Sequence, residues 1–448
     1  MKQRSGQFGV LGLGITGQSV VRYLLRNGVI PTVYDTRNHT DVGVELAPEV
    51  PIQWQVESLA DCAVDTLIIS PGLDWNSALM RSIPESVEVL SDIDLFFEAV
   101  EKPVIGVTGT NGKSTVTSLV EHLLCNAGIK CKAGGNLGHA ALDLLQQEAD
   151  SYVLELSSFQ LERTSLLRFA TSSMLNLSED HLDKHSDLAA YRMAKQRIYS
   201  QCDLAVFNRG DLSTFPDGEV TERISFGLDI PANDSDFGIR RIEDRDWLCL
   251  GNLAFCAVDD LSIQGSHNVA NALAACALTS PWLSTDQYQK GLATFTGLAH
   301  RFEVVAEHHG VRFVNDSKAT NVGAAVAALD GFAHSKTVVL LGGGDAKGAD
   351  LEPFVLAMKG KVKMLVATGQ DGGQLVKLAQ AADITAQYCA EFADAVNLAY
   401  DSCEPGDTLL MSPGCASIDS FPNFKVRGET FAHLVHQRLD PAIAEGCA

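Results

Sequence analysis

The sequence is poor in basic residues. Its 448 residues include 34 Lys and Arg against 56 Asp and Glu, which gives a formal charge of −22 at pH 7. An acidic surface of this kind repels a phosphodiester backbone, so the composition argues against nucleic acid as a partner. An anionic ligand must therefore be held locally, by helix N-termini, backbone amides and a few well-placed cations.

Paired cysteines and long apolar runs are also missing. The 11 cysteines include no C-x-x-C pair and their number is odd, so neither a zinc ribbon nor a disulfide scaffold fits. No uninterrupted apolar run approaches the ~18 residues of a membrane span. The apolar stretch 8–15 is rich in Gly and lacks a cleavage site of small residues, which indicates a first strand and not a signal peptide. We expect a cytoplasmic protein without a membrane span.

Short apolar runs alternate with helix-length segments along the chain, which is typical of β-α units around buried parallel strands. The length is about three times the roughly 150 residues of a common domain. We therefore predict an α/β protein of three domains, at residues 1–93, 94–299 and 300–448, with short antiparallel strands within 215–260. The main expected strands are 8–13, 31–34, 66–70, 103–108, 151–156, 172–177, 204–207, 312–315, 337–341, 362–367 and 407–411.

The first glycine-rich motif, Gly12-Leu-Gly14-Ile-Thr-Gly17, follows an expected strand and opens an expected helix. Asp35 ends the next strand, so the dinucleotide-binding pattern is satisfied. Such a turn presents backbone N–H groups to a pyrophosphate, and a nicotinamide cofactor, another diphosphate or simple tight packing would each account for it. Ser70-Pro-Gly72 adds a second turn at the same edge of the sheet.

The second motif is more specific. Gly106-Val-Thr-Gly-Thr-Asn-Gly-Lys113-Ser114-Thr lies between a clear strand and a clear helix, although Gly106 stands one place too early for the strict phosphate-loop pattern. We interpret it as a loop whose amides surround a β-phosphate, with Lys113 toward the β and γ oxygens and Ser114 near Mg²⁺. The alternative is an ordinary glycine-rich turn.

Two further segments carry possible metal ligands. Glu155 ends an expected strand, from which its carboxylate could reach a metal beside the phosphate loop; otherwise it caps the following helix. His181 and His185 are four residues apart, but the Glu of H-E-x-x-H is absent. We therefore prefer His181 as a single Mg²⁺ ligand and expect His185 to be a surface residue.

Lys195 is expected to face inward. In the predicted helix 187–200 it shares a face with Leu188, Tyr191 and Ile198. Its ammonium could escape to the solvent at the edge of the helix. Alternatively, modification removes or inverts its charge, because an inward amine beside bound cations would be repelled.

Polar turns recur near the expected strand ends of the last third of the chain. They follow a helix in which Asn268 and Asn271, three residues apart, could bind a purine or cap the helix. Because the carboxyl ends of parallel strands lie along one edge of a sheet, the turns are expected to form a site. They are 300–301, 315–320, 342–347 and 412–417.

These motifs together resemble the Mur ligase family, the ATP-dependent amide-forming enzymes of peptidoglycan precursor synthesis. The segments that carry the resemblance are G-T-N-G-K-S-T at 109–115, L-E-L-S-S-F-Q-L at 154–161, E-D-H at 179–181, Y-R-M-A-K at 191–195, H-N-x-x-N at 267–271, H-R-F-E at 300–303 and N-D-S-K-A-T-N at 315–321. Within the family, the chain is most similar to the members that add D-glutamate to UDP-N-acetylmuramoyl-L-alanine, through the segments 12–17, 35–37, 70–72 and 412–417. The D-N-P-R motif of the members that add a diamino acid is absent.

The resemblance implies a Rossmann-like N-terminal domain that binds the UDP substrate, a central P-loop ATPase-like domain, and a C-terminal Rossmann-like α/β domain that closes on ATP. It implies ATP, two Mg²⁺ ions and a carbamylated Lys195 as an anionic metal ligand. The expected partners are small molecules, namely ATP, D-glutamate and UDP-N-acetylmuramoyl-L-alanine, and the protein is expected to be a monomer.

The resemblance also implies roles for individual residues. The catalytic residues are Lys113, Glu155, His181 and Lys195. The metal ligands are Ser114, Glu155, His181 and the carbamate of Lys195. The ATP-binding residues are Gly109, Thr110, Asn111, Gly112, Lys113, Ser114, Thr115, Asn268, Asn271, Arg301 and Asp316. Those that bind the UDP substrate are Gly14, Ile15, Thr16, Asp35, Thr36, Arg37, Ser70, Pro71, Gly72 and Asn136, and those that bind D-glutamate are Lys318, Thr320, Lys347, Ser417 and Phe424.

Overall fold

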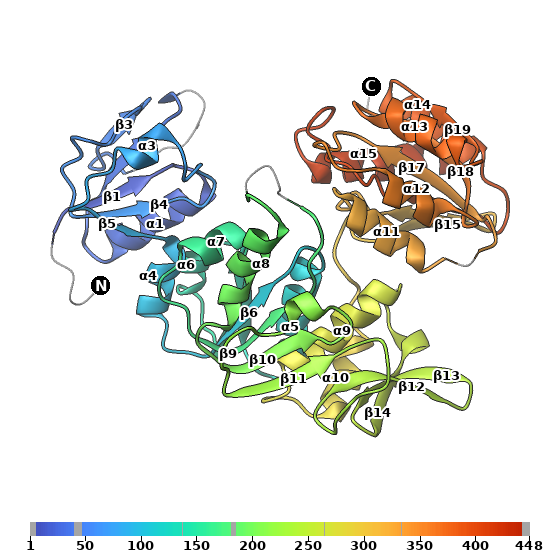
Figure 1. Ribbon diagram of the computed structural model, residues 1–448, viewed down its shortest axis with the longest axis horizontal. Helices are drawn as coiled ribbons and strands as arrows, with labels where there is room; N and C mark the ends of the chain where they lie inside the picture. Colours follow the sequence, from blue (N-terminus) through green and yellow to red (C-terminus); the bar gives the residue numbers. More distant parts are fainter. Residues whose placement is uncertain are drawn as a thin grey trace. The chain divides into compact units, whose positions relative to one another are not determined.

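The computed structural model describes residues 6–39, 47–136, 138–180, 185–263, 265–332 and 334–440, and in these it contains three sheets (Figure 1). The chain divides into two compact units. The first unit comprises Met1–Leu177, His181–Asp259 and Asn271–Ala293, and the second Ser178–Asp180, Asp260–Ala270 and Thr294–Ala448. The predicted α/β class is confirmed.

The N-terminal sheet is parallel throughout, with strand order β3-β2-β1-β4-β5. Its central strands β1 and β4 are buried along their whole length, as expected for short apolar runs covered on both faces. The strands are β1 (Phe8–Leu11), β2 (Thr32–Asp35), β3 (Ile52–Trp54), β4 (Thr66–Ile69) and β5 (Glu88–Leu90). The helices are α1 (Ile15–Arg26), α3 (Ala78–Arg81) and α4 (Asp92–Ala99).

The central sheet has nine strands in the order β14-β13-β12-β11-β10-β9-β6-β8-β7. Its strands are β6 (Val104–Thr108), β7 (Cys131–Gly135), β8 (Ser151–Glu155), β9 (Phe169–Met174), β10 (Cys202–Asn208), β11 (Glu222–Phe226), β12 (Phe237–Ile242), β13 (Arg245–Leu250) and β14 (Leu253–Ala257). Its helices are α5 (Lys113–Asn126), α6 (Ala141–Leu144), α7 (Ser158–Arg163), α8 (Leu188–Gln196), α9 (Ser266–Leu278) and α10 (Thr285–Leu292). The antiparallel strands predicted within 215–260 are β12, β13 and β14, whereas β11 pairs in parallel with both neighbours.

One apolar core joins the first two sheets. Helix α4 begins in a capping box, in which Ser91 and Asp94 exchange hydrogen bonds between side chain and backbone. Its Phe96 ring lies 5.6 Å from the ring of Tyr152 on β8, edge to face. Phe96 and Tyr152 belong to the same buried cluster as Val10 of β1. The boundary predicted at residue 93 therefore falls within a helix that packs against both sheets.

The C-terminal sheet has the order β15-β16-β20-β17-β18-β19, and in it only β15 pairs antiparallel among the described residues. Helices α11, α12 and α13 contribute to one of its two cores, and α14 and α15 to the other. The strands are β15 (Glu303–His308), β16 (Val311–Asn315), β17 (Val338–Gly343), β18 (Val362–Thr368), β19 (Ala386–Tyr388) and β20 (Thr408–Met411). The helices are α11 (Val322–Asp330), α12 (Glu352–Met358), α13 (Gly372–Ala381), α14 (Phe392–Asp401) and α15 (Phe424–Leu439).

Candidate active site

The phosphate loop connects β6 to α5. Gly109 and Gly112 have φ angles of 149° and 82°, a backbone region that favours glycine. Gly112 is the N-cap of α5 and supplies no side-chain cap, so the helix begins with its backbone amides facing the loop. This arrangement is suited to bind the phosphates of a nucleotide.

Asn176, which follows β9, holds the loop in shape. Its backbone carbonyl accepts a hydrogen bond from Thr110 N (3.1 Å). Its side chain accepts one from Asn111 N (2.8 Å) and donates one to Asn111 O (3.0 Å). Sequence reasoning missed this residue, although its position just beyond a strand end is a signal that could have found it.

Two lysine side chains reach the same carbonyl of the loop. Lys113 Nζ donates to Gly109 O (2.7 Å) and Thr110 O (2.8 Å), and Lys195 Nζ donates to Gly109 O (2.9 Å). Lys195 is 1% exposed and its ammonium lies 4.5 Å from the centre of the Tyr191 ring. The inward orientation of Lys195 is confirmed, and the alternative of an ammonium escaping to solvent is wrong. Leu188, expected on the same face, is instead 38% exposed.

Glu155 ends β8 beside this loop and is 2% exposed. Its Oε1 accepts a hydrogen bond from Asn136 Nδ2 (2.7 Å), whereas its Oε2 is buried without a hydrogen-bond partner among the described residues. Glu155 does not cap α7, because Ser157 and Gln160 form a capping box there. A buried carboxylate oxygen is costly unless a cation or a donor satisfies it, so Glu155 fits a metal site.

The predictions for the two histidines that precede α8 in the sequence, His181 and His185, differ in what the structure says of them. His181 lies outside the described residues, and within them no group of three or more His, Cys, Asp or Glu is arranged to hold a metal. His185 was expected at the surface, but it is buried, with Nε2 3.0 Å from Ser158 Oγ and its ring stacked on Phe159. Ser158 and Phe159 belong to α7. His185, which precedes α8 in the sequence, therefore packs against α7.

Helix α9 carries the two asparagines predicted to bind ATP. Asn268 is 7% exposed and Asn271 is 8% exposed. A Cβ atom placed on Gly112 would lie 2.5 Å from Asn271 Oδ1, so the Asn271 side chain lies directly against the phosphate loop. The φ angle of Gly112 favours glycine, and a larger residue there would also require the Asn271 side chain to move.

In the N-terminal sheet, Asp35 orders the first glycine-rich turn. Its Oδ2 accepts from Leu13 N (2.6 Å) and Arg37 Nη2 (2.8 Å), and its Oδ1 from Arg37 N (2.8 Å) and Nε (2.9 Å). Desolvation favours the neutral carboxyl, but the hydrogen bonds from Arg37 and Leu13 outweigh it and hold the pKa of Asp35 below its usual range. Both oxygens of Asp35 are thus engaged within the protein, while the Arg37 side chain stays 43% exposed.

The two N-terminal turns are joined to each other. Ser70 Oγ donates to Gly12 O (3.0 Å), and a Cβ atom on Gly17 would lie 1.8 Å from the same oxygen. Ile15 is 69% exposed at the start of α1, whose N-cap is Gly14. The predicted residues of the two turns therefore lie at one edge of the sheet, with Thr16 half-buried and Thr36 and Gly72 exposed.

In the C-terminal sheet, Asp316 follows β16. Its Oδ2 accepts from Ser412 Oγ (2.8 Å) and its Oδ1 from Phe302 N (3.2 Å). Desolvation raises the pKa of Asp316 to about 7, against the lowering effects of these hydrogen bonds and of Arg301. His300 and Phe302, on either side of Arg301, have φ angles of 63° and 51°, so the backbone that leads into this sheet is strained.

The residues predicted to bind D-glutamate lie on connected turns. Lys318 Nζ lies 4.2 Å from the centre of the Phe424 ring. Asp345 and Ala416 exchange backbone hydrogen bonds of 3.1 and 2.8 Å, which ties the turn of Lys347 to the loop that ends in Ser417. Lys347 is exposed with a φ angle of 51°, Ser417 is buried and Thr320 is half-buried.

Arg427 of α15 connects two of these loops, and no motif identified it. Its guanidinium donates to Ser317 Oγ (3.0 Å) and Ser317 O (2.8 Å), and to the carbonyls of Cys415 and Ala416. The residue is 3% exposed, and desolvation lowers its pKa to about 10. Because an unmatched buried charge is costly, these contacts fix the two loops relative to each other.

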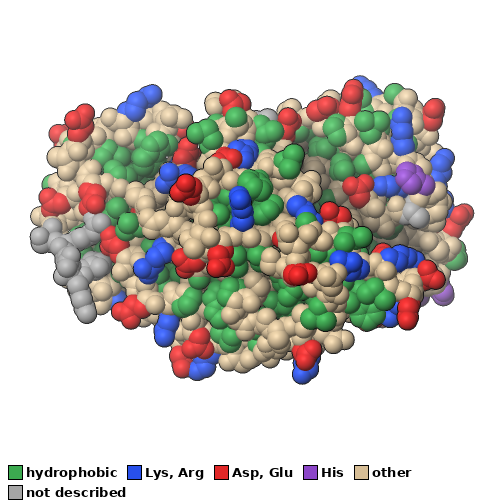
Figure 2. Space-filling view, turned by 60° about the horizontal axis from the view of Figure 1, so that its bottom comes forward, with side chains coloured by type: hydrophobic (Ala, Val, Ile, Leu, Met, Phe, Trp, Pro, Cys, Tyr) green, Lys and Arg blue, Asp and Glu red, His purple; other side chains and the backbone are tan. Residues whose placement is uncertain are grey.

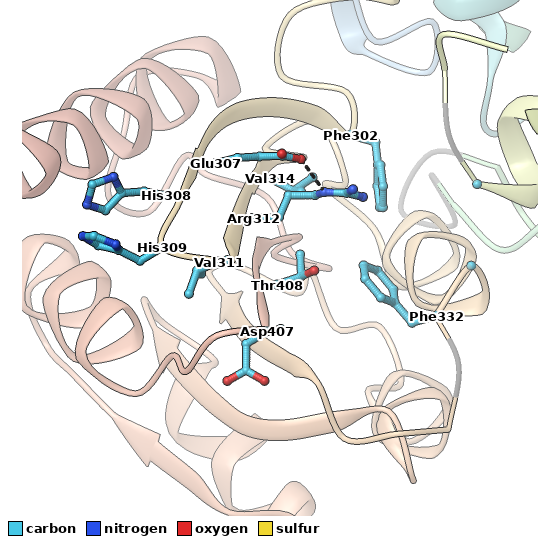
Figure 3. A pocket seen from close by; sticks show the side chains of 14 residues that line it. Phe302, Glu307, His308, His309, Val311, Arg312, Val314, Phe332, Asp407 and Thr408 are labelled. Carbon is cyan, nitrogen blue, oxygen red and sulfur yellow. Dashed lines mark hydrogen bonds and ion pairs between the residues drawn. The ribbon is translucent and has the colours of Figure 1, made fainter. Parts of the chain in front are cut away.

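A cavity of about 560 Å³ lies elsewhere on the same sheet (Figure 3). It is lined by the Phe302 and Phe332 rings, 6.0 Å apart, and by Arg312, which forms an ion pair with Glu307 at 3.0 Å. Thr408, which opens β20, also lines it, whereas Ser412 follows the other end of that strand. None of the predicted site residues lines this cavity.

The surface charges agree with the composition. On the face seen in Figure 2, Lys and Arg side chains are interspersed with Asp and Glu, and those that can be described form no continuous basic area. Across the ranges that the structure describes, no helix combines the length and the apolar character needed to cross a membrane.

Known proteins resemble this chain over nearly its whole length. Family models match at residues 6–91 (Mur ligase MurD-like, N-terminal domain), 107–279 (Mur ligase middle domain) and 300–415 (Mur ligase, glutamate ligase domain). The UDP-N-acetylmuramoylalanine–D-glutamate ligase of Pseudoalteromonas translucida is 41% identical over 444 residues, covering 96% of this chain and 97% of the relative. The ligase of the same name from Escherichia coli K12 is 41% identical over 435 residues, with coverages of 96% and 97%.

Solved structures share the fold at lower identity. The UDP-N-acetylmuramate-alanine ligase of Thermotoga maritima superposes with a TM-score of 0.63 at 19% identity, covering 97% of this chain and 100% of that one. A pseudomurein peptide ligase of Methanothermus fervidus gives a TM-score of 0.61 at 18% identity, with coverages of 97% and 100%. With three matching domain models and relatives 41% identical along almost the entire sequence, the chain belongs to the Mur ligase family.

Proposed function

We infer that this protein is an ATP-dependent ligase that joins D-glutamate to UDP-N-acetylmuramoyl-L-alanine in peptidoglycan precursor synthesis. The observation that carries this inference is the identity of 41%, along 96% of the chain, with ligases that bear this name. The phosphate loop beside the buried Lys195 and Glu155 supports it. The predicted cytoplasmic location and monomeric state stay predictions.

The reaction needs ATP because a carboxylate and an amine do not condense in water. In the proposed first step, a carboxylate oxygen of the alanyl group attacks the γ-phosphorus of ATP, and ADP leaves. The nitrogen of D-glutamate then attacks the carbonyl carbon of the resulting acyl phosphate. A tetrahedral intermediate forms, the amine loses its proton and inorganic phosphate leaves with the former carboxylate oxygen.

Lys113 and the loop amides are proposed to hold the phosphates of ATP during this transfer. Members of this family use Mg²⁺, which when bound neutralises charge on the transferring phosphoryl group. Glu155 would hold it through its buried Oε2, together with Ser114 and His181. We further propose that two Mg²⁺ ions bind at this site.

Lys195 in its ammonium form does not fit a metal site, because a second positive charge there would be repelled. The lysine ammonium first loses one proton. The neutral amine then adds carbon dioxide and loses a second proton, so the charge changes from +1 to −1 as the carbamate forms. We propose that this carbamate is an anionic metal ligand. The position of the side chain supports the proposal, because Lys195 is buried beside the phosphate loop, with its Nζ 2.9 Å from Gly109 O.

The remaining assignments are those that the resemblance to the family implies. For ATP we propose the loop residues Gly109–Thr115 with Asn268, Asn271, Arg301 and Asp316. For the UDP substrate we propose Gly14, Ile15, Thr16, Thr36, Arg37, Ser70, Pro71, Gly72 and Asn136, with Asp35 orienting Arg37. For D-glutamate we propose Lys318, Thr320, Lys347, Ser417 and Phe424.

An isotope-transfer experiment tests the proposed function by following an oxygen atom of the alanyl carboxylate. The substrate is labelled with ¹⁸O in the alanyl carboxylate and incubated with ATP and D-glutamate. Acyl-phosphate chemistry places one labelled oxygen in the released phosphate, and phosphate appears only when both co-substrates are present. An absorbance change with NAD(P)H would instead support an oxidoreductase, and ATP binding without turnover would support a nucleotide-switched binding protein.

A further inference from the structure

Arg163 is the last residue of α7, and it binds backbone carbonyls of the second N-terminal turn. Its Nη1 donates to Pro71 O (2.6 Å) and its Nη2 to Leu73 O (2.7 Å). Nη1 also lies 3.5 Å from Ser70 O. The guanidinium lies 5.1 Å from the centre of the Trp75 ring, which restricts its orientation.

These contacts determine how the turn presents its amides. The described residues contain no cis peptide bond, so each carbonyl points away from the N–H of the same peptide unit. With the carbonyls of Pro71 and Leu73 directed at Arg163, the N–H groups of Gly72 and Asp74 are directed away from it. Amides aligned in this way bind anions, and Ser70 Oγ transmits the same constraint to the Gly12 turn.

Helix α7 also begins close to the proposed metal ligand. Its N-cap, Ser157, follows Glu155 by two residues, and the capping box with Gln160 fixes the start of the helix. Arg163 at the other end contacts the turn that follows β4 of the N-terminal sheet. One short helix therefore connects the strand end that carries Glu155 to the turn assigned to the nucleotide.

Separate contacts hold the same segment to α4 without touching the turn. Asp94 Oδ1 accepts from Ser165 N (2.7 Å) and Leu166 N (2.9 Å). The hydroxyl oxygens of Ser91 and Thr164 are 3.1 Å apart. The segment after α7 therefore has its own attachment, so the bonds of Arg163 to the turn can be tested apart from general packing.

We propose that Arg163 is a positioning residue for the UDP substrate, which orients the Ser70–Leu73 turn toward the diphosphate and fixes it relative to Glu155. The proposal rests on the function inferred above, which assigns this turn to the nucleotide. Arg163 need not touch the substrate, since it acts through the backbone of the turn.

The test compares three variants of the full chain. Arg163→Gln removes the charge and most of the donors, Arg163→Lys keeps the charge, and Asp94→Asn weakens the neighbouring attachment. We expect Arg163→Gln to raise KM for the UDP substrate by about tenfold or more and KM for ATP by less than about twofold. Arg163→Lys should recover part of the loss, and Asp94→Asn should lower Tm without changing either KM.

Calorimetric titration with the UDP substrate alone separates this proposal from the proposed function. Weaker binding to Arg163→Gln than to wild type, with normal binding to Asp94→Asn, supports the positioning role whether or not turnover is seen. Equal binding by all variants, or equal losses in Arg163→Gln and Asp94→Asn, overturns it. A wild type that binds the nucleotide but releases no phosphate with ATP and D-glutamate would contradict the ligase function alone.

Discussion

The central sheet and the two outer sheets hold their charged residues in different surroundings. In the central sheet's site, Lys195 and Glu155 are 1% and 2% exposed. At the outer sheets, the Arg37 side chain is 43% exposed and Lys347 is exposed on its turn. Buried charges act strongly on a charge that develops during reaction, whereas exposed charges on turns can bind and release a substrate. Central variants should therefore lower turnover, and outer variants should each raise one KM.

The outer sheets also differ from each other. The loops of the C-terminal sheet are held by Arg427, which belongs to a helix on that sheet. The nucleotide turn of the N-terminal sheet is held by Arg163, from a helix of the central sheet. The proposed D-glutamate site is thus ordered by a helix of its own sheet, whereas the proposed nucleotide site depends on a helix of the neighbouring sheet.

The largest effect is expected for Lys195→Ala. Loss of the proposed carbamate removes an anion needed mainly in the transition state, so kcat should fall by about a hundredfold or more while ATP binding stays nearly intact. Steady-state kinetics and nucleotide titration measure the two quantities. Added formate or acetate should partly restore turnover, and near-normal kcat without it would show that no anionic ligand is needed.

Lys347→Ala tests the C-terminal sheet. An ammonium that binds a substrate carboxylate contributes on the order of 1.5–3 kcal/mol, and more is lost when a buried charge is left unpaired. KM for D-glutamate should therefore rise roughly ten- to several-hundred-fold, with KM for ATP nearly unchanged. Lys377→Ala, an exposed lysine of α13, is the matched control. A normal KM for D-glutamate in Lys347→Ala would remove this residue from the site.

Arg37→Ala tests the N-terminal sheet. KM for the UDP substrate should rise by about tenfold, because the variant loses the exposed guanidinium and the two hydrogen bonds that the Arg37 side chain donates to Asp35. The hydrogen bond from the backbone N–H of residue 37 to Asp35 remains. KM for ATP should change little, and Arg81→Ala, an exposed arginine of α3, should behave as wild type. Tight NADH binding by the full chain would overturn the assignment of this sheet to a uridine nucleotide.

The smallest effect concerns Asp92 at the start of α4. Desolvation raises its pKa to about 7, and its Oδ1 is buried without a hydrogen-bond partner among the described residues. A raised pKa means that the folded state favours the protonated form, so its contribution to stability is present at low pH and is lost as pH rises through about 7. Asp92→Asn should match the wild-type Tm near pH 4 and exceed it by about 2–4 °C near pH 8. Equal Tm differences at both pH values would contradict this.

Local patterns predicted the elements that dominate each core. The strands β1, β6 and β17 were predicted correctly because every residue in them is buried, which leaves a continuous apolar run in the sequence. The short strands β3 and β19 were missed, since three residues with little burial carry almost no periodic signal. The antiparallel edge strand β15 was also missed, because half-exposed residues interrupt its apolar pattern.

The parts of the candidate site that could be predicted are those whose residues lie close together in the sequence. The phosphate loop and the inward Lys195 follow from local spacing. Arg163 and Arg427 could not be found in this way, because each has a carbonyl partner about a hundred residues distant in sequence, at separations of 92 for Pro71 and 110 for Ser317. Their roles exist only once the sheets have brought those segments together.

The proposed function requires that this chain uses D-glutamate as its amine substrate. Its most direct test is coupled phosphate release by the wild type with ATP and UDP-N-acetylmuramoyl-L-alanine, comparing D-Glu, L-Glu, L-Ala and L-Lys as the amine. We expect rapid release with D-Glu and little with the other three, because we propose that Lys347 and Ser417 bind the second carboxylate of an amino acid of the D configuration. Equal release with L-Lys, or none with D-Glu, would contradict it.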